Sequence, residues 1–245
     1  MSAKHRPPTP ARTIVSVDLG MAIDPTAISI LEITTRGTIR DRYYAAPDDA
    51  RGALMAPPLA WFDTRPGGSG GLRETGRPVF VDVGYLERLP LRVAYPDQVA
   101  HVAGLMRHPR FRNATLVVDS TGVGKPVTQM FERAGLKPVG VTITAGAGES
   151  RDPDNARDFR VSKLMLVSRL QAALHEGVLR IQKTLPDASA LVAELNNFRG
   201  IFTDSGAARF GAREGAHDDM VLSLAIGNWY ATREFGASSW GTYVI

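Results

Sequence analysis

Residues 220–230 constrain the fold of this 245-residue chain more than any other segment. Their apolar side chains fall on nearly every face of a helix, and a helix without a polar face must be covered on all sides. We therefore expect a helix buried along its length. His217, Asp218 and Asp219 stand at its start. Acidic residues are favoured in a first helical turn, so one interpretation is that Asp218 or Asp219 only caps the helix.

The first third of the chain predicts an antiparallel meander. Runs rich in β-branched and apolar residues predict three strands, at residues 13–20, 26–34 and 38–44. Residues 45–78 are rich in proline and glycine, which indicates a flexible insertion. Strand character then returns at residues 79–83 and 85–93.

Strands and helices alternate in the rest of the chain. Strands are predicted at residues 115–119, 139–144 and 178–181. Helices are predicted at residues 95–107, 124–134, 159–175 and 186–198, with a glycine-rich loop running through about residue 150. A meander followed by this alternation predicts an α/β fold with a mixed sheet flanked by helices. We expect one domain over residues 13–235, between a disordered basic tail (residues 1–12) and a C-terminal tail (residues 236–245).

Composition narrows the class of protein. No apolar run approaches the length of a membrane span, and the basic, proline-rich N-terminus lacks the apolar core of a secretory signal. Cysteine is absent, which excludes disulfides and thiolate zinc sites and fits a cytoplasmic protein. The net charge of +4 comes mainly from arginine. A basic surface suits a nucleic-acid partner, although an arginine-rich codon usage would give the same composition.

Acidic residues close two of the predicted strands. Asp18 ends the first strand and Asp119 ends a later, central one. Ligands gather at the carboxyl ends of strands in α/β sheets, so neighbouring strands would bring these acids together, and Asp218 could complete the cluster. Clustered carboxylates raise one another's pKa values and favour hard cations such as Mg²⁺ or Mn²⁺. Two ions about 4 Å apart would suit phosphodiester hydrolysis. The alternative is that each acid only builds a turn.

The glycine-rich turn after Asp119 does not have the spacing of a nucleotide-binding P-loop. Lys125 is followed by Pro126, where a P-loop requires serine or threonine after its lysine. A tight turn from strand to helix that presents Asp119 explains these glycines better.

Candidate DNA contacts are basic residues near the predicted site. Arg157, Arg160 and Lys163 follow the glycine-rich loop near a helix start, where phosphates could bind. Arg209 and Arg213 lie just before the acidic pair. The alternative for each of these five residues is an ordinary solvated surface position.

Three motifs resemble the nuclease domain of the large terminase subunit of tailed phages. They are Val17-Asp18-Leu19-Gly20, Asp119-Ser120-Thr121-Gly122-Val123-Gly124 and His217-Asp218-Asp219-Met220. The resemblance extends from about residue 13 to residue 229, which is nearly the whole chain.

This resemblance implies an RNase H-like fold and a metal-dependent endonuclease that cuts concatemeric double-stranded DNA during genome packaging. It implies that two Mg²⁺ or Mn²⁺ ions are the cofactors. By motif, Asp18, Asp119 and Asp218 would be the catalytic, metal-binding acids, with Asp219 beside them. Asp24 matches an accessory acid of some members, and His217 would assist the metal unless it merely begins the helix.

Two departures qualify this resemblance. Full-length large terminases carry an N-terminal packaging ATPase, and no P-loop occurs here. We expect a separately encoded nuclease working with a separate packaging ATPase, a portal and a small terminase subunit in the bacterial host; an isolated domain or a degenerate remnant is the alternative. Many relatives also have an acid three residues after the acidic pair, where this chain has Leu222.

Other functional classes remain open from the sequence. A Holliday-junction resolvase or another RNase H-like nuclease would share the acid cluster but prefer branched or hybrid substrates. An ATPase of the actin-like type also uses an Asp-Leu-Gly turn, but 245 residues are few for its two lobes. A catalytically silent DNA-binding or motor-docking module would not need the acids for metal binding.

Overall fold

The computed structural model describes residues 12–34, 43–44, 80–122, 124–146, 148–202, 208–212 and 217–235. The strands of its large sheet are, in chain order, β1 (Arg12–Asp18), β2 (Ala27–Thr34), β3 (Tyr43–Tyr44), β4 (Phe80–Arg88), β5 (Thr115–Asp119), β6 (Val139–Thr144), β7 (Glu149–Arg151), β8 (Asp158–Ser162) and β9 (Leu179–Gln182). The helices are α2 (Tyr95–Arg107), the short 3₁₀ turn η2 (Pro109–Phe111), α3 (Gly124–Arg133), α4 (Lys163–His175), α5 (Ala188–Asn197) and α6 (Asp219–Phe235). A separate hairpin consists of β10 (Phe198–Phe202) and β11 (Ala208–Ala212).

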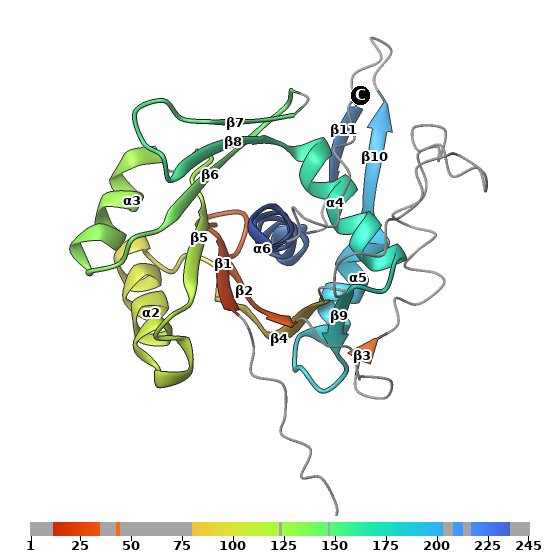
Figure 1. Ribbon diagram of the computed structural model, residues 1–245, viewed down its shortest axis with the longest axis horizontal. Helices are drawn as coiled ribbons and strands as arrows, with labels where there is room; N and C mark the ends of the chain where they lie inside the picture. Colours follow the sequence, from red (N-terminus) through yellow and green to blue (C-terminus); the bar gives the residue numbers. More distant parts are fainter. Residues whose placement is uncertain are drawn as a thin grey trace, which may run out of the picture.

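The large sheet is mixed, as the sequence predicts. Its strand order is β3-β9-β4-β2-β1-β5-β6-β8-β7. The pairs β1–β2 and β2–β4 are antiparallel, whereas β1–β5, β5–β6 and β6–β8 are parallel. The carboxyl ends of β1, β5, β6 and β8 therefore meet at one edge of the sheet (Figure 1). Residues that follow these four strands are brought together there.

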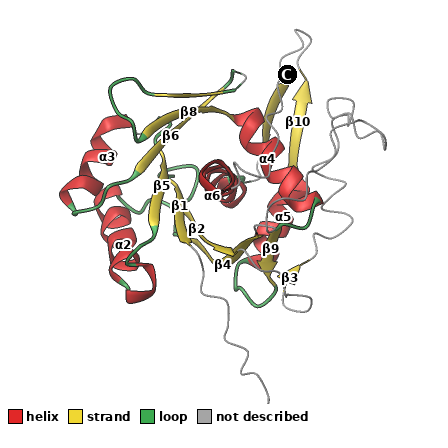
Figure 2. Cartoon of the chain, viewed as in Figure 1, coloured by secondary structure: helices red, strands yellow, loops and turns green. Residues whose placement is uncertain are grey.

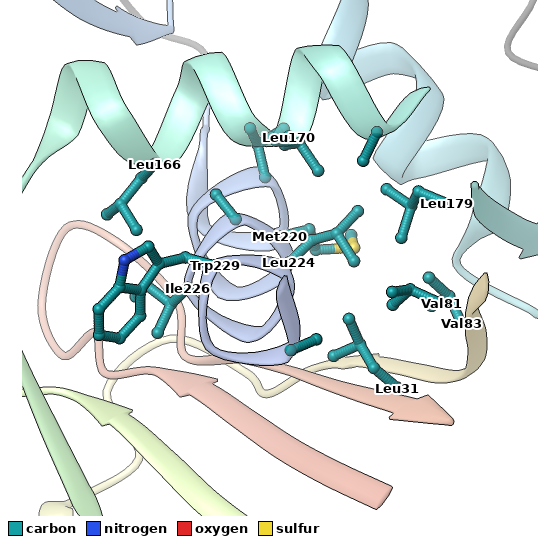
Figure 3. Packing of buried hydrophobic residues seen from close by; sticks show 14 of the residues in the cluster. Leu31, Val81, Val83, Leu166, Leu170, Leu179, Met220, Leu224, Ile226 and Trp229 are labelled. Atoms are coloured by element: carbon teal, nitrogen blue, oxygen red, sulfur yellow. The ribbon is translucent and has the colours of Figure 1, made fainter. Parts of the chain in front are cut away.

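Helix α6 lies in the middle of the molecule, between the sheet and α4 (Figures 1 and 2). Val221, Leu224, Ile226 and Trp229 are fully buried, which confirms the helix predicted to be covered on all sides. Figure 3 shows α6 side chains packed between α4 and the sheet strands β2, β4 and β9. A second buried cluster on the opposite face of the sheet includes Val102 and Phe131, so α2 and α3 cover that face.

Close approach of α6 to the sheet depends on small residues. Ser16 Oγ donates to the Ser223 carbonyl at 2.7 Å, and Ser223 Oγ donates to the Ser16 carbonyl at 3.0 Å. A Cβ atom on Gly227 would lie 2.9 Å from Ser16 Cβ and 2.6 Å from a Leu31 methyl group. The backbone of the helix therefore packs directly against β1 and β2.

The opening meander differs from the sequence expectation in its third strand. β4 pairs with β2, whereas the short β3 pairs with β9 on the far edge. β4 also runs continuously through Gly84 to Arg88 instead of forming two strands. A shift of register opposite Ile30 and Leu31 absorbs this irregularity within one strand. The remainder of the predicted insertion, residues 45–78, lies outside the described residues.

The helix predicted from residue 159 begins later, at Lys163. Residues 158–162 form β8, because Phe159 and Val161 are buried while Arg160 between them is exposed, which is the alternation of a strand. Ser162 Oγ then accepts a hydrogen bond from the Met165 backbone N–H at 3.1 Å and caps α4. The glycine-rich loop likewise contains a short strand, β7, and the β10–β11 hairpin was not predicted.

The predicted tails, residues 1–11 and 236–245, lie outside the described residues, and β1 already includes Arg12. No helix in the described part of the chain is long and apolar enough to cross a bilayer. The limits of the predicted domain stay a prediction.

Candidate metal centre

Asp18 and Asp119 are neighbours at the ends of adjacent parallel strands. Val17 of β1 pairs with Val118 of β5, so the next residue of each strand is an aspartate at the same edge. Asp119 is buried, and its Oδ1 accepts a hydrogen bond from the Thr121 backbone N–H at 2.7 Å. Asp119 thus builds the turn after β5 and also faces Asp18.

The electrostatics of this pair are those of crowded carboxylates. Removal from water raises the pKa of Asp18 well above its usual value, and the charges of Asp119, Asp219 and Asp218 raise it further. Burial also raises the pKa of Asp119, although its bonds from Thr121 partly offset this. These carboxylates disfavour one another's ionisation, and a cation placed among them would relieve that repulsion.

Asp219 is the most buried acid of α6, with 2% of its surface exposed. Its Oδ2 lies 3.0 Å from Arg88 Nε, and its Oδ1 lies 3.7 Å from His217 Nδ1. Among the described residues, no other side chain donates a hydrogen bond to either carboxylate oxygen, so the contact with Arg88 is an ion pair. Burial raises the pKa of Asp219, and the positive charges of Arg88 and His217 act in the opposite direction. A buried carboxylate without hydrogen bonds is a group that a metal ion would satisfy.

Asp24, His217 and Asp219 are close enough to share an ion. One ligand atom from each lies within 4.8 Å of the others. Among the described residues, no second group of three acidic or histidine side chains has this arrangement. Asp18 interacts electrostatically with Asp119 and Asp218, but these three described residues do not bring their ligand atoms as close together.

A cavity of about 410 Å³ connects these residues. Its walls include Asp18, Asp218 and Asp219 together with the whole loop of residues 19–25. Leu222 also lines it and offers no ligand atom. Asp119 lies beside the cavity, and Thr121 and Gly122 of its turn line the wall.

The loop that carries Asp24 is held from inside. A Cβ atom on Gly20 would lie 2.0 Å from the Asp24 carbonyl oxygen, so only glycine fits there. Thr26 Oγ1 accepts from the Gly20 N–H at 3.0 Å, and buried Gln98 of α2 donates to the Gly20 carbonyl at 2.8 Å. Gln98 was not predicted, and a single glutamine near a helix start gives no sequence signal for this role.

Arg88 and Glu194 are two further residues that sequence reasoning missed. Buried Glu194 of α5 accepts hydrogen bonds from the Met220 and Val221 backbone N–H groups at 3.0 and 3.2 Å, so it caps α6. Arg88 at the end of β4 pairs with both Glu194 and Asp219. An acid between Leu191 and Leu195 on an apolar helix face was the signal that could have identified Glu194.

The three predicted DNA-contacting residues whose side chains the structure describes have different surroundings. Lys163 Nζ lies 3.1 Å from Asp218 Oδ2, inside the acidic cluster. Arg157 lies 3.7 Å from Glu132, and Arg160 is exposed on β8. Arg213 and the side chain of Arg209 lie outside what the structure describes.

The chain is similar to large terminase subunits, as its motifs predict. It is 26% identical over 132 residues to the terminase large subunit of Thermus phage G20c. This match covers 54% of the chain and 23% of that protein, so the chain spans about a quarter of the relative's length. No protein-family model matches the chain.

Solved structures show the same fold. The large terminase nuclease from the thermophilic phage G20c with bound magnesium has a TM-score of 0.55 at 20% identity, over 89% of this chain and 80% of that one. The large terminase nuclease domain of Thermus phage P74-26 has a TM-score of 0.53 at 18% identity, over 90% and 79% of the two chains. These likenesses confirm the predicted RNase H-like fold.

Proposed function

We propose that this chain is a metal-dependent DNA endonuclease of the terminase type. The observation that carries the proposal is the position of four aspartates. Asp18 and Asp119 end adjacent parallel strands, and the start of α6 brings Asp218 and Asp219 to the same place. The raised pKa of Asp18 reflects this crowding and the burial of the site. Such a cluster beside a cavity is suited to divalent cations and phosphodiester chemistry.

Two Mg²⁺ or Mn²⁺ ions are the cofactors that we propose. Asp24, His217 and Asp219 would hold one ion, because their ligand atoms lie close together and the buried Asp219 carboxylate accepts no hydrogen bond from another described side chain. Asp18, Asp119 and Asp218 would hold the other. The similar nuclease of phage G20c binds magnesium. The ions would supply a nucleophilic water at neutral pH and neutralise the leaving oxygen.

The residues of this chain would supply the framework for that reaction. Arg88 would hold the Asp219 carboxylate through their ion pair. Gln98 would hold the loop that carries Asp24 through its hydrogen bond to the Gly20 carbonyl. The turn after β5 fixes Asp119 through its bond from Thr121. Leu222 in the cavity wall adds no ligand, so the acids at positions 218 and 219 would carry that side of the site.

The substrate that we propose is concatemeric double-stranded DNA during phage genome packaging in a bacterial cell. The sequence similarity to the large terminase subunit of Thermus phage G20c supports this substrate. A separate packaging ATPase, a portal and a small terminase subunit would be the partners. Exposed Arg160 on β8 and Arg157 before it are proposed to contact DNA phosphates, and Lys163, Arg209 and Arg213 stay candidates on sequence grounds.

The test is cleavage of linear, supercoiled and four-way DNA in the presence of Mn²⁺. We expect cuts in both duplex substrates. Strong preference for the four-way junction would favour a resolvase, and no cleavage of any substrate would favour a silent binding module. Asp18→Asn, Asp119→Asn and Asp218→Asn should each reduce the rate by at least about a thousandfold, since each removes a proposed ligand. Asp97→Asn, an exposed acid of α2, is the control with the same change of charge.

A further inference from the structure

Lys163 lies inside the acidic cluster. It is the first residue of α4, directly after β8, and the carboxyl end of β8 lies at the same edge as those of β1 and β5. Lys163 Nζ is 3.1 Å from Asp218 Oδ2, and the two side chains are 26% and 22% exposed. This ion pair joins two positions that are 55 residues apart in the chain.

The position of Lys163 is not explained by the stability of α4. A positive charge at the N-terminus of a helix is disfavoured by the helix dipole. The first turn of α4 contains no acidic residue that would offset this, and Ser162 already caps the helix. The favourable partner of the ammonium group is therefore Asp218, together with the charge of Asp119, whose pKa Lys163 lowers.

A second contact for the ammonium group lies nearby. Lys163 Nζ is 5.7 Å from the centroid of the Phe198 ring, a distance at which a cation is attracted by an aromatic face. Phe198 is buried, and it immediately follows α5. If the ammonium group leaves Asp218, the Phe198 ring therefore offers it a second favourable contact within the site.

We propose that Lys163 is a built-in cation that pairs with Asp218 and is displaced from it by a divalent metal ion. The proposal rests on the function proposed above, since it requires a metal site at Asp218. A tethered ammonium and a bound ion compete for the same carboxylate, so the ion pair lowers the affinity of this site for metal. Displacement would free the ammonium for another contact at the moment the ion is bound.

The experiment is a calorimetric titration of the whole chain with Mn²⁺, without DNA. We expect Lys163→Met to bind Mn²⁺ on the order of tenfold more tightly than the unsubstituted protein, because a partly exposed ion pair contributes modestly. Lys163→Arg keeps the charge and should bind Mn²⁺ with nearly unchanged affinity. Lys137→Met removes the same charge from an exposed loop position and controls for net charge.

The possible results distinguish a failure of the proposed competition from a failure of the proposed nuclease function. Equal affinity of Lys163→Met and Lys137→Met, or weaker binding by Lys163→Met, overturns the competition while leaving the nuclease function standing. No Mn²⁺ binding by the unsubstituted chain overturns both. If thermal unfolding shows that Lys163→Met is not folded, Lys163→Gln replaces it, and the same increase in affinity is expected.

Discussion

Asp219 shows how one side chain joins the core to the candidate site. Its Oδ2 faces Arg88 and its Oδ1 faces His217, so the two oxygens are directed toward different partners. Arg88 also pairs with Glu194, so its guanidinium links the Asp219 carboxylate to α5. Asp18, in contrast, has mainly other carboxylates around it. The site therefore contains one acid balanced by protein cations and another that lacks such balance.

Stability of the metal-free protein should depend on pH through Asp18. Its pKa is raised in the folded state, so the folded protein holds this proton more tightly than the unfolded chain does. The resulting stabilisation is complete below the ordinary carboxyl pKa of about 3.9 and is lost as the pH rises through the raised value. Thermal unfolding in a chelator should therefore show that raising the pH destabilises the unsubstituted protein more than Asp18→Asn. Identical pH profiles would contradict this expectation.

At the scale of elements, α6 depends on contacts that its own sequence does not contain. Its first backbone N–H groups are satisfied by Glu194 from α5, and its middle is packed against β1 and β2 at Gly227. The helix is thereby fixed both along its axis and in its distance from the sheet. Asp218 and Asp219 are placed by these contacts, because they stand at the start of the helix.

Glu194→Ala should destabilise the protein by about 2–3 kcal/mol. The change removes two hydrogen bonds to α6 and leaves Arg88 with one buried partner fewer, and the partial exposure of Arg88 moderates the cost. Urea denaturation measures the loss. Glu132→Ala, at an exposed position of α3, is the control and should change stability by less than about 0.5 kcal/mol.

Gly227→Ala should also be destabilising, although alanine is normally the better helix former. The added Cβ would meet Ser16 Cβ at 2.9 Å and a Leu31 methyl at 2.6 Å, and such overpacking costs about 1–3 kcal/mol. Gly104→Ala in α2 is the matched control, because its nearest neighbour would be 4.0 Å away. That control should gain about 0.5–1 kcal/mol in the same denaturation experiment. A gain at both positions would show that α6 can move away from the sheet.

At the scale of the whole molecule, the cavity lies where the two halves of the sheet meet. Antiparallel β2 and β4 lie on one side of β1, and parallel β5, β6 and β8 lie on the other. Elements from both ends of the chain contribute to the same edge, from the loop after β1 to the start of α6. An ion bound here would contact elements from both ends of the chain, so its binding should stabilise the complete fold.

Mn²⁺ should raise the thermal stability of the chain. A ligand that binds only the folded state at about 100 times its dissociation constant contributes about 2.7 kcal/mol, or about 5–10 °C in Tm for a protein of this size. A chelator should reverse the shift. Asp219→Asn should reduce the shift, whereas Asp97→Asn on α2 should retain it. A full shift in Asp219→Asn would remove Asp219 from the proposed metal ligands.

Elements whose sequence patterns are local could be predicted before the structure. The apolar segment of α6, the strands that end at Asp18 and Asp119, and the turn at Gly122 follow from side-chain periodicity and turn chemistry, as does the mixed α/β class. The motifs also indicated the aspartates and His217. These features could be predicted because they depend on residues within a few positions of one another.

Contacts between distant parts of the chain depend instead on how the whole chain folds. Arg88, Gln98 and Glu194 act through partners 26 to 131 positions away, and no local pattern records such a pairing. The same is true of Lys163, which pairs with Asp218 across 55 positions, while its contact with DNA stays a prediction. Strand pairing and the packing of α6 set these distances, and both are properties of the folded chain as a whole.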